Sequence, residues 1–362
     1  MSDHDLSLSE LINVQLMAQG PMSLSTYMSI ALTHPTLGYY KKADPLGQAG
    51  DFITAPEISQ MFGEMIGIWI AQTWQQLGSP SQFSLVELGP GRGTLMADCI
   101  RVLQQVPGIL DAASINLIET NPVLIEKQRA NLAGQNVVWR SEIDQLAVES
   151  GPLLIIANEF FDALPIKQFQ FSEGKWHERL VGLKGNDRQW GLSPTPLPQE
   201  AFPQDLNPEE NAIWETNFIA QQVTKDIADL IGKRGGALLA IDYGYPESQT
   251  GETLQALKAH KPVDPLDEPG EADLTAHVDF GALTDVAEKA GMNVCSLMTQ
   301  AQFLKAMGIE PRAHNFASAS PEAAPKIVAD LARLVEDGQM GTLFKAWCMH
   351  NAPTPPYPFE AK

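Results

Sequence analysis

The sequence has 362 residues, of which 44% are hydrophobic and 19% are charged, enough for one large domain with insertions or for two domains. A formal net charge of −20 and a pI near 4.7 argue against a nucleic acid as partner, because the phosphate backbone would be repelled. The three cysteines are far apart and show neither a metal-binding spacing nor a disulfide framework. With no signal-peptide pattern and no apolar run of membrane-spanning length, we expect a cytoplasmic protein without membrane insertion and without a metal site.

Residues 1–80 are expected to form a helical extension. Apolar residues recur at helical spacing over 8–19 and 23–34. Residues 35–56 are rich in glycine and proline, which predicts a loop. A longer amphipathic pattern over 56–78 predicts a long helix.

From residue 81 onward, strands alternate with helices. The strands are near-continuous apolar runs, which is typical of a parallel sheet that helices cover on both faces. Ligands of such sheets bind beyond the carboxyl ends of the strands. The expected strands are 83–89, 114–120, 136–140, 151–160 and 236–245, and the expected helices between them are 93–106 and 121–133.

Two insertions, near 165–210 and 245–280, interrupt this pattern. The first opens with a period-two hairpin signal over 166–183. We expect an α/β domain over 81–362 whose insertions cover the ligand face as a lid, since loops of this length are usually functional or disordered. The remaining predicted elements are helices near 211–231, 280–290, 302–307 and 325–336 and a last strand over 342–350.

A glycine-rich turn follows the first strand in "SLVELGPGRGTLMADCI". The dinucleotide fingerprint G-x-G-x-x-G needs a third glycine where this sequence has Thr94, because its glycines are Gly89, Gly91 and Gly93. Glu87, near the end of the strand, would repel a pyrophosphate but attract an ammonium. S-adenosylmethionine carries an ammonium and a sulfonium and no phosphate, so the turn favours that cofactor over NAD.

Two further residues bear on the cofactor. Glu119 ends the second strand, where a carboxylate can accept both hydroxyls of a ribose, a contact that serves either cofactor. Arg92 leaves an alternative open, since it could pair with a phosphate or neutralise Glu87. A purely structural turn, with Glu87 and Glu119 as solvated strand ends, is the remaining interpretation.

Four stretches together match one family: "GDFITAPEISQMFGEMIG", "VELGPGRGTLMADCIR", "ANEFFDALPIKQF", and "IDYGY" with "ADLTAHVDF". The chain resembles the MidA-type family of S-adenosylmethionine-dependent methyltransferases over most of its length. The resemblance implies a class I methyltransferase fold and N-methylation of a protein arginine. It also implies a role in assembling NADH:ubiquinone oxidoreductase (complex I), whose peripheral-arm subunit is the substrate of mitochondrial members. It leads us to expect that a loop containing Gly50 and Asp51 covers the cofactor.

Three alternatives remain beside an arginine methyltransferase. An assembly chaperone would use partner binding more than turnover, yet it would not need the retained cofactor residues. A small-molecule methyltransferase is disfavoured by the acidic lid, which suits a basic peptide better. An NAD-dependent oxidoreductase is disfavoured by Thr94 and Glu87.

The segment "ANEFFDALP" contains the candidate catalytic residues. An arginine acceptor is protonated, and a carboxylate that holds two of its N–H groups can orient the guanidinium and localise its charge away from the attacking nitrogen. Glu159 is the first candidate for this role, Asp162 the second, and Asn158 is an orienting amide. The structural alternative is that Glu159 caps the next helix and Asp162 pairs with a lysine such as Lys167.

Candidate substrate-binding residues follow later strands. Asp242 and Tyr243 end the strand "GALLAIDYGY", and Tyr243 either walls the substrate channel or packs under the lid. His277 and Asp279 share a face and are expected to form either an acid–base pair or a loop staple, of which we favour the staple. "TAPE" reads as a helix start, with Thr54 as N-cap and Glu57 in the capping-box position.

Overall fold

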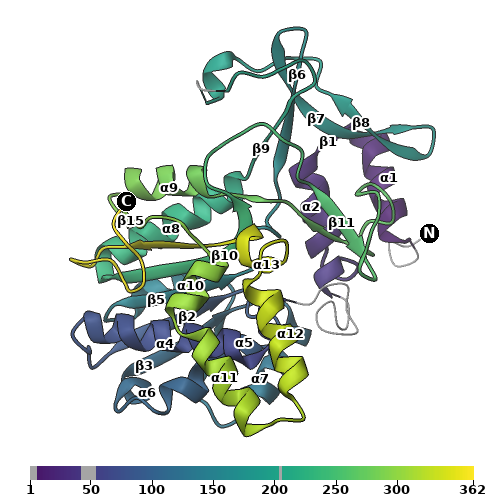
Figure 1. Ribbon diagram of the computed structural model, residues 1–362. Coiled ribbons are helices and arrows are strands. Elements are labelled where there is room, and N and C mark those ends of the chain that lie inside the picture. The colour runs from purple at the N-terminus through teal and green to yellow at the C-terminus, as the bar shows by residue number, and fades with distance from the viewer. Residues whose placement is uncertain (1–5, 42–53, 204–205) are drawn as a thin grey trace. The chain divides into compact units, whose positions relative to one another are not determined.

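The structure is a computed structural model that describes residues 6–41, 54–203 and 206–362. The chain divides into two compact units, each built from three segments (Figure 1). Unit 1 comprises Met1–Phe52, Asp162–Gln221 and Tyr245–Ala282, and unit 2 comprises Ile53–Phe161, Gln222–Gly244 and Leu283–Lys362. Both predicted insertions therefore belong to unit 1, together with the first two helices.

Unit 2 is built on a mostly parallel sheet. Five of its strands, β10, β5, β2, β3 and β4, run parallel, and β17 runs antiparallel between β10 and β15. In spatial order the strands are β15 (Asn293–Val294), β17 (Phe344–His350), β10 (Gly236–Tyr245), β5 (Leu153–Asn158), β2 (Phe83–Leu88), β3 (Ala113–Ile118) and β4 (Val137–Arg140), and the short β16 (Met298–Thr299) pairs with β17.

Helices lie on both faces of this sheet (Figure 1). Strand residues such as Leu85, Leu154 and Leu239 form one core with the helices α4 and α5. The opposite face carries α8 and α9. This arrangement, with a parallel sheet in the order of a doubly wound fold, confirms the predicted fold class. The helices around this sheet include α4 (Gln60–Gln76), α5 (Thr94–Leu103), α6 (Ile109–Ala112), α7 (Pro122–Asn131), α8 (Phe218–Arg234) and α9 (Phe280–Lys289).

Helix α4 belongs to unit 2 because two of its glycines let it approach α5 closely. A Cβ at Gly63 would lie 2.5 Å from the Cβ of Asp98, and one at Gly67 would lie 3.0 Å from the Cα of Cys99. The boundary between units thus falls near residue 53, whereas the sequence placed this helix with the N-terminal extension.

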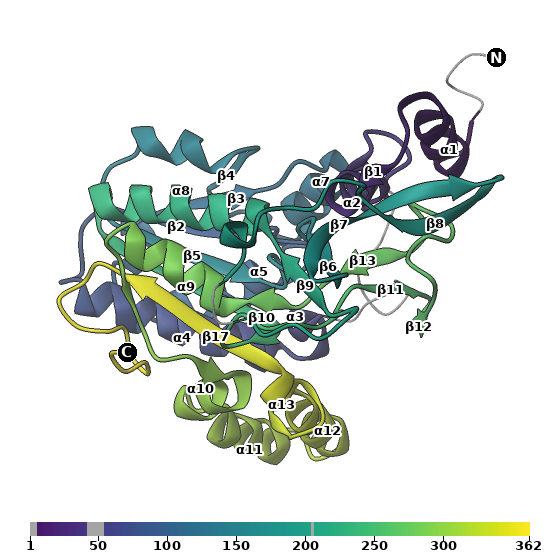
Figure 2. The same ribbon diagram turned by 90° about the horizontal axis from the view of Figure 1, so that it is seen from above.

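A group of short helices precedes β17 and packs next to α4 (Figure 2). The sequence missed α11, in which Pro311 lies in the first turn. The members of the group are α10 (Gln300–Ala306), α11 (Ile309–Ala319), α12 (Ala324–Val335) and α13 (Met340–Leu343), and the one-turn helix α3 (Ala55–Ile58) lies before α4.

Unit 1 combines two helices with two small antiparallel sheets. The predicted hairpin is confirmed: its turn residues Glu173 and Gly174 have φ of 51° and 75°, as a tight two-residue turn requires. Unit 1 consists of α1 (Leu8–Gln19), β1 (Met22–Ser23), α2 (Leu24–Thr33), η1 (Tyr39–Lys41), β6 (Lys167–Ser172), β7 (Lys175–Lys184), β8 (Asp187–Leu192), η3 (Gln199–Ala201), β9 (Ile213–Thr216), β11 (Gln255–Lys258), β12 (Lys261–Pro262), β13 (Asp273–Thr275) and β14 (Val278–Asp279).

The predicted helix over 211–231 is wrong in its first part. Residues Ile213–Thr216 form β9, which pairs with β6, and the side chain of Asn217 then accepts a hydrogen bond from the Ala220 N–H at 2.8 Å. Tertiary pairing with β6 overrides the helical pattern here, and Asn217 marks the true start of the helix.

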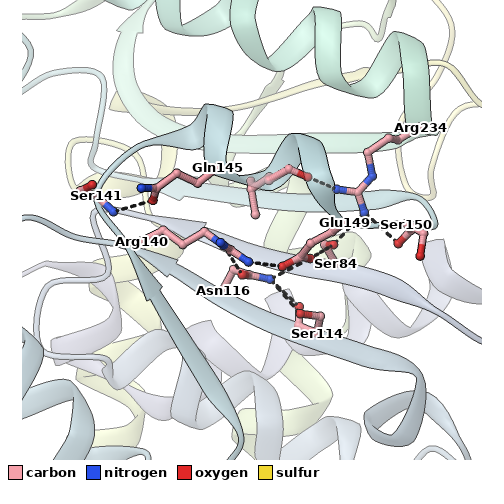
Figure 3. Close-up of polar contacts among 10 residues, drawn as sticks. Ser84, Ser114, Asn116, Arg140, Ser141, Gln145, Glu149, Ser150 and Arg234 are labelled. Carbon is pink, nitrogen blue, oxygen red and sulfur yellow. Dashed lines mark hydrogen bonds and ion pairs between the residues drawn. The ribbon is translucent and has the colours of Figure 1, made fainter.

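A polar network ties η2 (Ile143–Val148) and its C-terminal neighbour Glu149 to the sheet (Figure 3). Glu149 accepts hydrogen bonds from Ser84 Oγ at 2.5 Å and from Arg140. Arg234 donates to Ser84 Oγ at 2.8 Å and to the carbonyls of Leu146, Ser150 and Gly151. The network therefore holds together the start of β2, the end of β4 and the end of α8.

Among the helices in the described ranges, none is both long enough and apolar enough to cross a membrane.

Candidate functional site

The turn between β2 and α5 takes a conformation that only glycine adopts easily. Gly89, Gly91 and Gly93 have φ of 59°, 54° and 80°, all in the left-handed region. A Cβ at Gly89 would lie 3.0 Å from the ring of Phe160. Gly93 is also the N-cap of α5, so the turn leads directly into a helix N-terminus.

Glu87 lies inside this end of the sheet. Its side chain is 3% exposed, and its Oε2 has no hydrogen-bond partner among the described residues. Burial raises the pKa of Glu87 to about 8. Without a cation beside it the group is therefore mostly protonated at neutral pH, and a bound cation would favour its carboxylate form.

Glu119 follows β3 directly and is tied to its own loop. Its Oε1 accepts from the N–H groups of Thr120 and Asn121 at 2.8 and 2.7 Å, and its Oε2 accepts from Gln128 Nε2 at 3.3 Å. Glu119 is thus a partly exposed strand end whose carboxylate is hydrogen-bonded within its own loop and to Gln128. The carboxylate is oriented by its neighbours.

Gln128 links the two cofactor-binding candidates, and sequence reasoning missed it. This fully buried side chain donates to the carbonyl of Gly91 at 2.8 Å and to Glu119, and it accepts from Trp139 Nε1 at 2.8 Å. The sequence did contain a signal for this residue. Gln128 lies four residues after Leu124 on the buried face of α7, where a polar side chain must find hydrogen-bond partners.

Arg92 and Glu57 form an ion pair at the start of α5. Arg92 Nη1 lies 3.7 Å from Glu57 Oε2, and Thr94 Oγ1 donates to Glu57 Oε1 at 2.6 Å. Glu57 therefore does not complete the predicted capping box. Thr54 is the N-cap of α3, as predicted, but its side chain makes no capping hydrogen bond. Arg92 therefore pairs with Glu57 rather than with Glu87.

Glu159 is held in a strained conformation at the end of β5. Its φ is 48°, which is costly for a residue with a Cβ, and its N–H donates to the Ile241 carbonyl at 2.9 Å. Its Oε1 accepts from the Ala55 N–H at 2.9 Å and from Asn158 Nδ2 at 3.2 Å. The helix N-terminus that it contacts is thus that of α3, not the next helix. Asn158 thus contacts the Glu159 carboxylate, and its role as an orienting amide stays a prediction.

Asp162 belongs to unit 1, where it is 5% exposed. Its carbonyl accepts from the Ala276 N–H at 3.0 Å. Tyr40 Oη donates to Asp273 at 3.0 Å, and burial, then Asp273 and then Asp162, raise the pKa of Tyr40 well above its usual range. Asp162 and Asp273 are therefore two buried acidic residues that both act on the half-buried Tyr40. Lys167, the suggested partner of Asp162, pairs with Glu178 at 3.0 Å.

Sequence reasoning did not single out Tyr40 and Asp273. Tyr40 lies in the glycine- and proline-rich stretch 35–56, and Asp273 lies in "ADLTAHVDF". Their contact joins residues 233 positions apart, which no local pattern reveals.

Asp242 and Tyr243 are buried at the end of β10. Asp242 Oδ2 accepts from the Phe161 N–H and Oδ1 from the Tyr243 N–H, both at 3.0 Å, so this carboxylate holds the segment that follows β5. The Tyr243 ring makes an edge-to-face contact with Phe344, at 5.3 Å between centroids. Tyr243 therefore packs as a buried aromatic residue in the core of unit 2, and its role at a substrate channel stays a prediction.

His277 and Asp279 make contacts typical of a loop staple. The His277 N–H donates to Thr253 Oγ1 at 2.9 Å. Asp279 accepts from Ser248 Oγ at 2.6 Å and from the Ala282 N–H at 2.9 Å, at the start of α9. Gly50 and Asp51 lie outside the described residues. Within the described ranges, no three His, Cys, Asp or Glu side chains are grouped so that they could hold a metal ion.

Residues 65–298 match the sequence model of the family described as "Putative S-adenosyl-L-methionine-dependent methyltransferase". Proteins named protein arginine methyltransferase NDUFAF7 from Danio rerio and Homo sapiens are 36% and 35% identical to this chain, over 93% and 92% of it and over 85% and 81% of their own lengths. The Drosophila melanogaster homologue is 35% identical, over 95% of this chain and 84% of its own. The chain belongs to this methyltransferase family.

A solved structure agrees with this methyltransferase in fold and in cofactor. It is a protein from Burkholderia thailandensis bound to S-adenosyl-homocysteine, with a TM-score of 0.85 and 25% identity, and the match covers 96% of this chain and 92% of that one. The class I methyltransferase fold and the assignment of S-adenosylmethionine as cofactor are both confirmed.

The residues at the end of β2 fit this cofactor. Glu87 offers a buried carboxylate oxygen to an ammonium, and the glycine turn leaves room for a ligand to approach the backbone. Glu119 offers a fixed carboxylate at the end of the neighbouring strand, where ribose hydroxyls bind in this fold class. Which of these residues contact the cofactor stays a prediction.

Proposed function

We propose that this methyltransferase transfers a methyl group to an arginine of a protein substrate. The observation that carries the proposal is the naming of its relatives as protein arginine methyltransferases at 35–36% identity over more than nine-tenths of the chain. The buried Glu87 and the glycine turn support catalysis rather than chaperoning alone, because a chaperone would not need a built cofactor site.

We further propose that the substrate is a peripheral-arm subunit of complex I and that the reaction takes place in the cytoplasm. The resemblance to the MidA-type family supports the first part. An excess of acidic residues, 44 Asp and Glu against 24 Lys and Arg, suits a partner whose methylated segment is basic.

The chemistry requires a neutral lone pair on a group that is normally protonated. S-adenosylmethionine supplies an electrophilic methyl on its sulfonium when it is bound. The chain's own residues must orient the guanidinium, exclude water and draw the positive charge away from the attacking nitrogen. A carboxylate with a fixed orientation does this best, because it can accept two N–H groups in one plane.

Glu159 is the side chain best prepared for this role. The strained φ of 48° and the hydrogen bonds from Ala55 and Asn158 fix the carboxylate in place before a substrate arrives. Strain of this kind is tolerated where the surrounding structure requires one geometry, as at active sites. Asp162, in unit 1, is the second candidate.

The test is intact-mass analysis of a complex I peripheral-arm subunit that is co-expressed with the methyltransferase or with its variants. Glu159→Gln keeps the shape and the Ala55 contact but removes the charge. We expect methylation to fall by about two orders of magnitude, with cofactor affinity and partner binding unchanged. Glu142→Gln, at an exposed glutamate, is the matched control.

Each result has a distinct meaning. Unchanged methylation by Glu159→Gln, with loss in Asp162→Asn, would move the guanidinium contact to Asp162. Absence of methylation by the wild-type protein, with partner binding intact, would contradict the enzyme proposal and favour the chaperone.

A further inference from the structure

Two of the three cysteines come together at the edge of the unit 2 sheet, away from the residues discussed above. The register of β15 and β17 pairs Asn293 with His350 and Val294 with Met349. Continued by one residue, it places Cys295 opposite Cys348. The Cys295 N–H donates to the Cys348 carbonyl at 3.0 Å, which confirms that the pairing extends to them.

Because strand side chains alternate, Cys295, Cys348 and His350 share one face of the sheet. Cys295 and Cys348 both contribute to the core that includes α4 and α10. Residues directly opposite in an antiparallel pair have Cα atoms about 5.5 Å apart, which is within the range that a disulfide spans. Their Cβ atoms need to approach by only about 1 Å to reach disulfide geometry.

We propose that Cys295 and Cys348 form a dithiol that a hydroperoxide oxidises reversibly to a disulfide. The Cys295 thiolate attacks one oxygen of ROOH, the O–O bond breaks, and the leaving oxygen takes a proton to become ROH. Cys295 is then a sulfenic acid. The Cys348 sulfur attacks it, the S–S bond forms, and the hydroxyl leaves with the Cys348 proton as water. The two sulfurs lose two electrons in total, and the peroxide gains them.

The two thiols differ in a way that assigns these roles. The Cys348 thiol and then His350 lower the pKa of Cys295 to about 6, against the opposing effect of burial. Burial and the neighbouring Cys295 raise the pKa of Cys348 well above its usual range. Cys295 is therefore the thiolate that meets the oxidant, and Cys348 is the resolving thiol.

Cys295 is only 2% exposed, and the last residues of the chain pair with the backbone beside it. Cys295 forms an isolated bridge with Ala361, and the Ser296 N–H donates to the Glu360 carbonyl at 2.9 Å. The proposal requires that local opening at this edge of the sheet admit a small oxidant such as hydrogen peroxide without global unfolding.

Cys99 provides an internal control. It is fully buried in α5, its Sγ donates to the Gly63 carbonyl at 3.3 Å, and burial raises its pKa well above the usual range. It lies in another element and has no cysteine partner among the described residues.

The experiment treats the wild-type protein with hydrogen peroxide and follows it by peptide mass mapping. We expect a linked Cys295–Cys348 peptide that has lost two hydrogens, full recovery with dithiothreitol, and an unmodified Cys99. A wild-type protein that keeps both thiols free, or whose Cys295 proceeds to a sulfinic acid without linking to Cys348, would overturn the proposal.

Two variants test the order of events. In Cys348→Ala, Cys295 should accumulate as a sulfenic acid that dimedone traps. In Cys295→Ala, Cys348 should react with peroxide at least tenfold more slowly than Cys295 does in the wild type. Equal rates for the two cysteines would contradict the assigned roles. The wild-type measurement stands by itself if either variant fails to fold.

Discussion

A glutamate lies at each end of strand β2, and the two differ in how their carboxyl groups are paired. At the first end, Ser84 donates to Glu149, which also pairs with Arg140 (Figure 3). At the other end, Glu87 is buried, and one of its carboxylate oxygens accepts no hydrogen bond from a described residue. The two ends of this short strand are close together, yet the Glu149 carboxylate accepts several hydrogen bonds and the Glu87 Oε2 accepts none from the described residues.

The pKa values of the two groups differ accordingly. Burial raises the pKa of Glu149, but hydrogen bonds from Ser84 and Arg140 and the charge of Arg234 outweigh it, so the pKa lies below its ordinary value. Burial alone raises the pKa of Glu87 to about 8. A paired carboxylate stabilises the fold, whereas a buried carboxyl group without a partner costs stability, which supports the prediction that Glu87 contacts a ligand.

The largest expected effect is at the paired end. Glu149→Gln should destabilise the protein by about 3 kcal/mol, because Arg140 would be left partly buried without its counter-charge. Urea unfolding measures this change. Cofactor affinity should stay within about twofold of wild type, since the network is remote from the glycine turn. Loss of stability no larger than that of the exposed control Glu142→Gln would break the comparison.

At the unpaired end, substitution of Glu87 should weaken cofactor binding rather than the stability of the fold. In Glu87→Gln, cofactor affinity should fall by about 1.5–3 kcal/mol, roughly 10- to 150-fold, because a hydrogen bond to a charged group is lost. Above pH 8, where the Glu87 side chain would be charged, the ligand-free variant should unfold at a higher temperature than the wild type, because glutamine removes a buried charge. Calorimetry with S-adenosyl-homocysteine and a thermal melt test both statements. Unchanged affinity would remove Glu87 from the cofactor site.

The pH dependence of stability separates the two glutamates by sign. The folded pKa of Glu87, about 8, lies above the reference value of 4.5, so its contribution is complete below pH 4.5 and is lost as pH rises towards 8. The folded pKa of Glu149 is lowered, so its contribution is present above pH 4.5 and is lost as pH falls. Each slope is at most about 1.4 kcal/mol per pH unit.

Urea unfolding of the ligand-free protein across this pH range checks these signs. Glu87→Gln should flatten the decline between pH 5 and 8 and leave the acid limb unchanged. Glu149→Gln should flatten the acid limb only. If both variants altered the same limb, the assignment of opposite pKa shifts would be wrong.

The unpaired end could be predicted from the sequence because it is local. A strand, a glycine turn and a helix are contiguous in the chain, and they place Gly89, Gly91 and Gly93 beside Glu87 whatever the rest of the chain does. Glu119 was found by the same reasoning at the next strand. The fold class followed from the alternation of strands and helices, which depends on neighbouring residues only.

The paired end could not be predicted, because its partners are distant in sequence. Arg234 reaches Ser84 across 150 positions, and nothing near either residue indicates the contact. The same limit hid the Tyr40–Asp273 contact, the meeting of Cys295 with Cys348 and the assembly of unit 1 from three segments. The hydrophobic periodicity of a helix or strand indicates which of its faces is buried. It does not indicate which distant residues pack against that face.

Gln128 supplies the smallest and most discriminating test, because it lies at the cofactor end but is fully paired. If pairing decides a residue's role, Gln128→Met should cost about 1 kcal/mol of stability, since the Trp139 N–H and the Gly91 carbonyl lose their partner. Cofactor affinity should fall only about three- to tenfold, through loss of the contact that helps to orient Glu119. The exposed Gln105→Met is the matched control. A loss of affinity as large as that of Glu87→Gln, without loss of stability, would show that position at the carboxyl end of the sheet matters more than pairing.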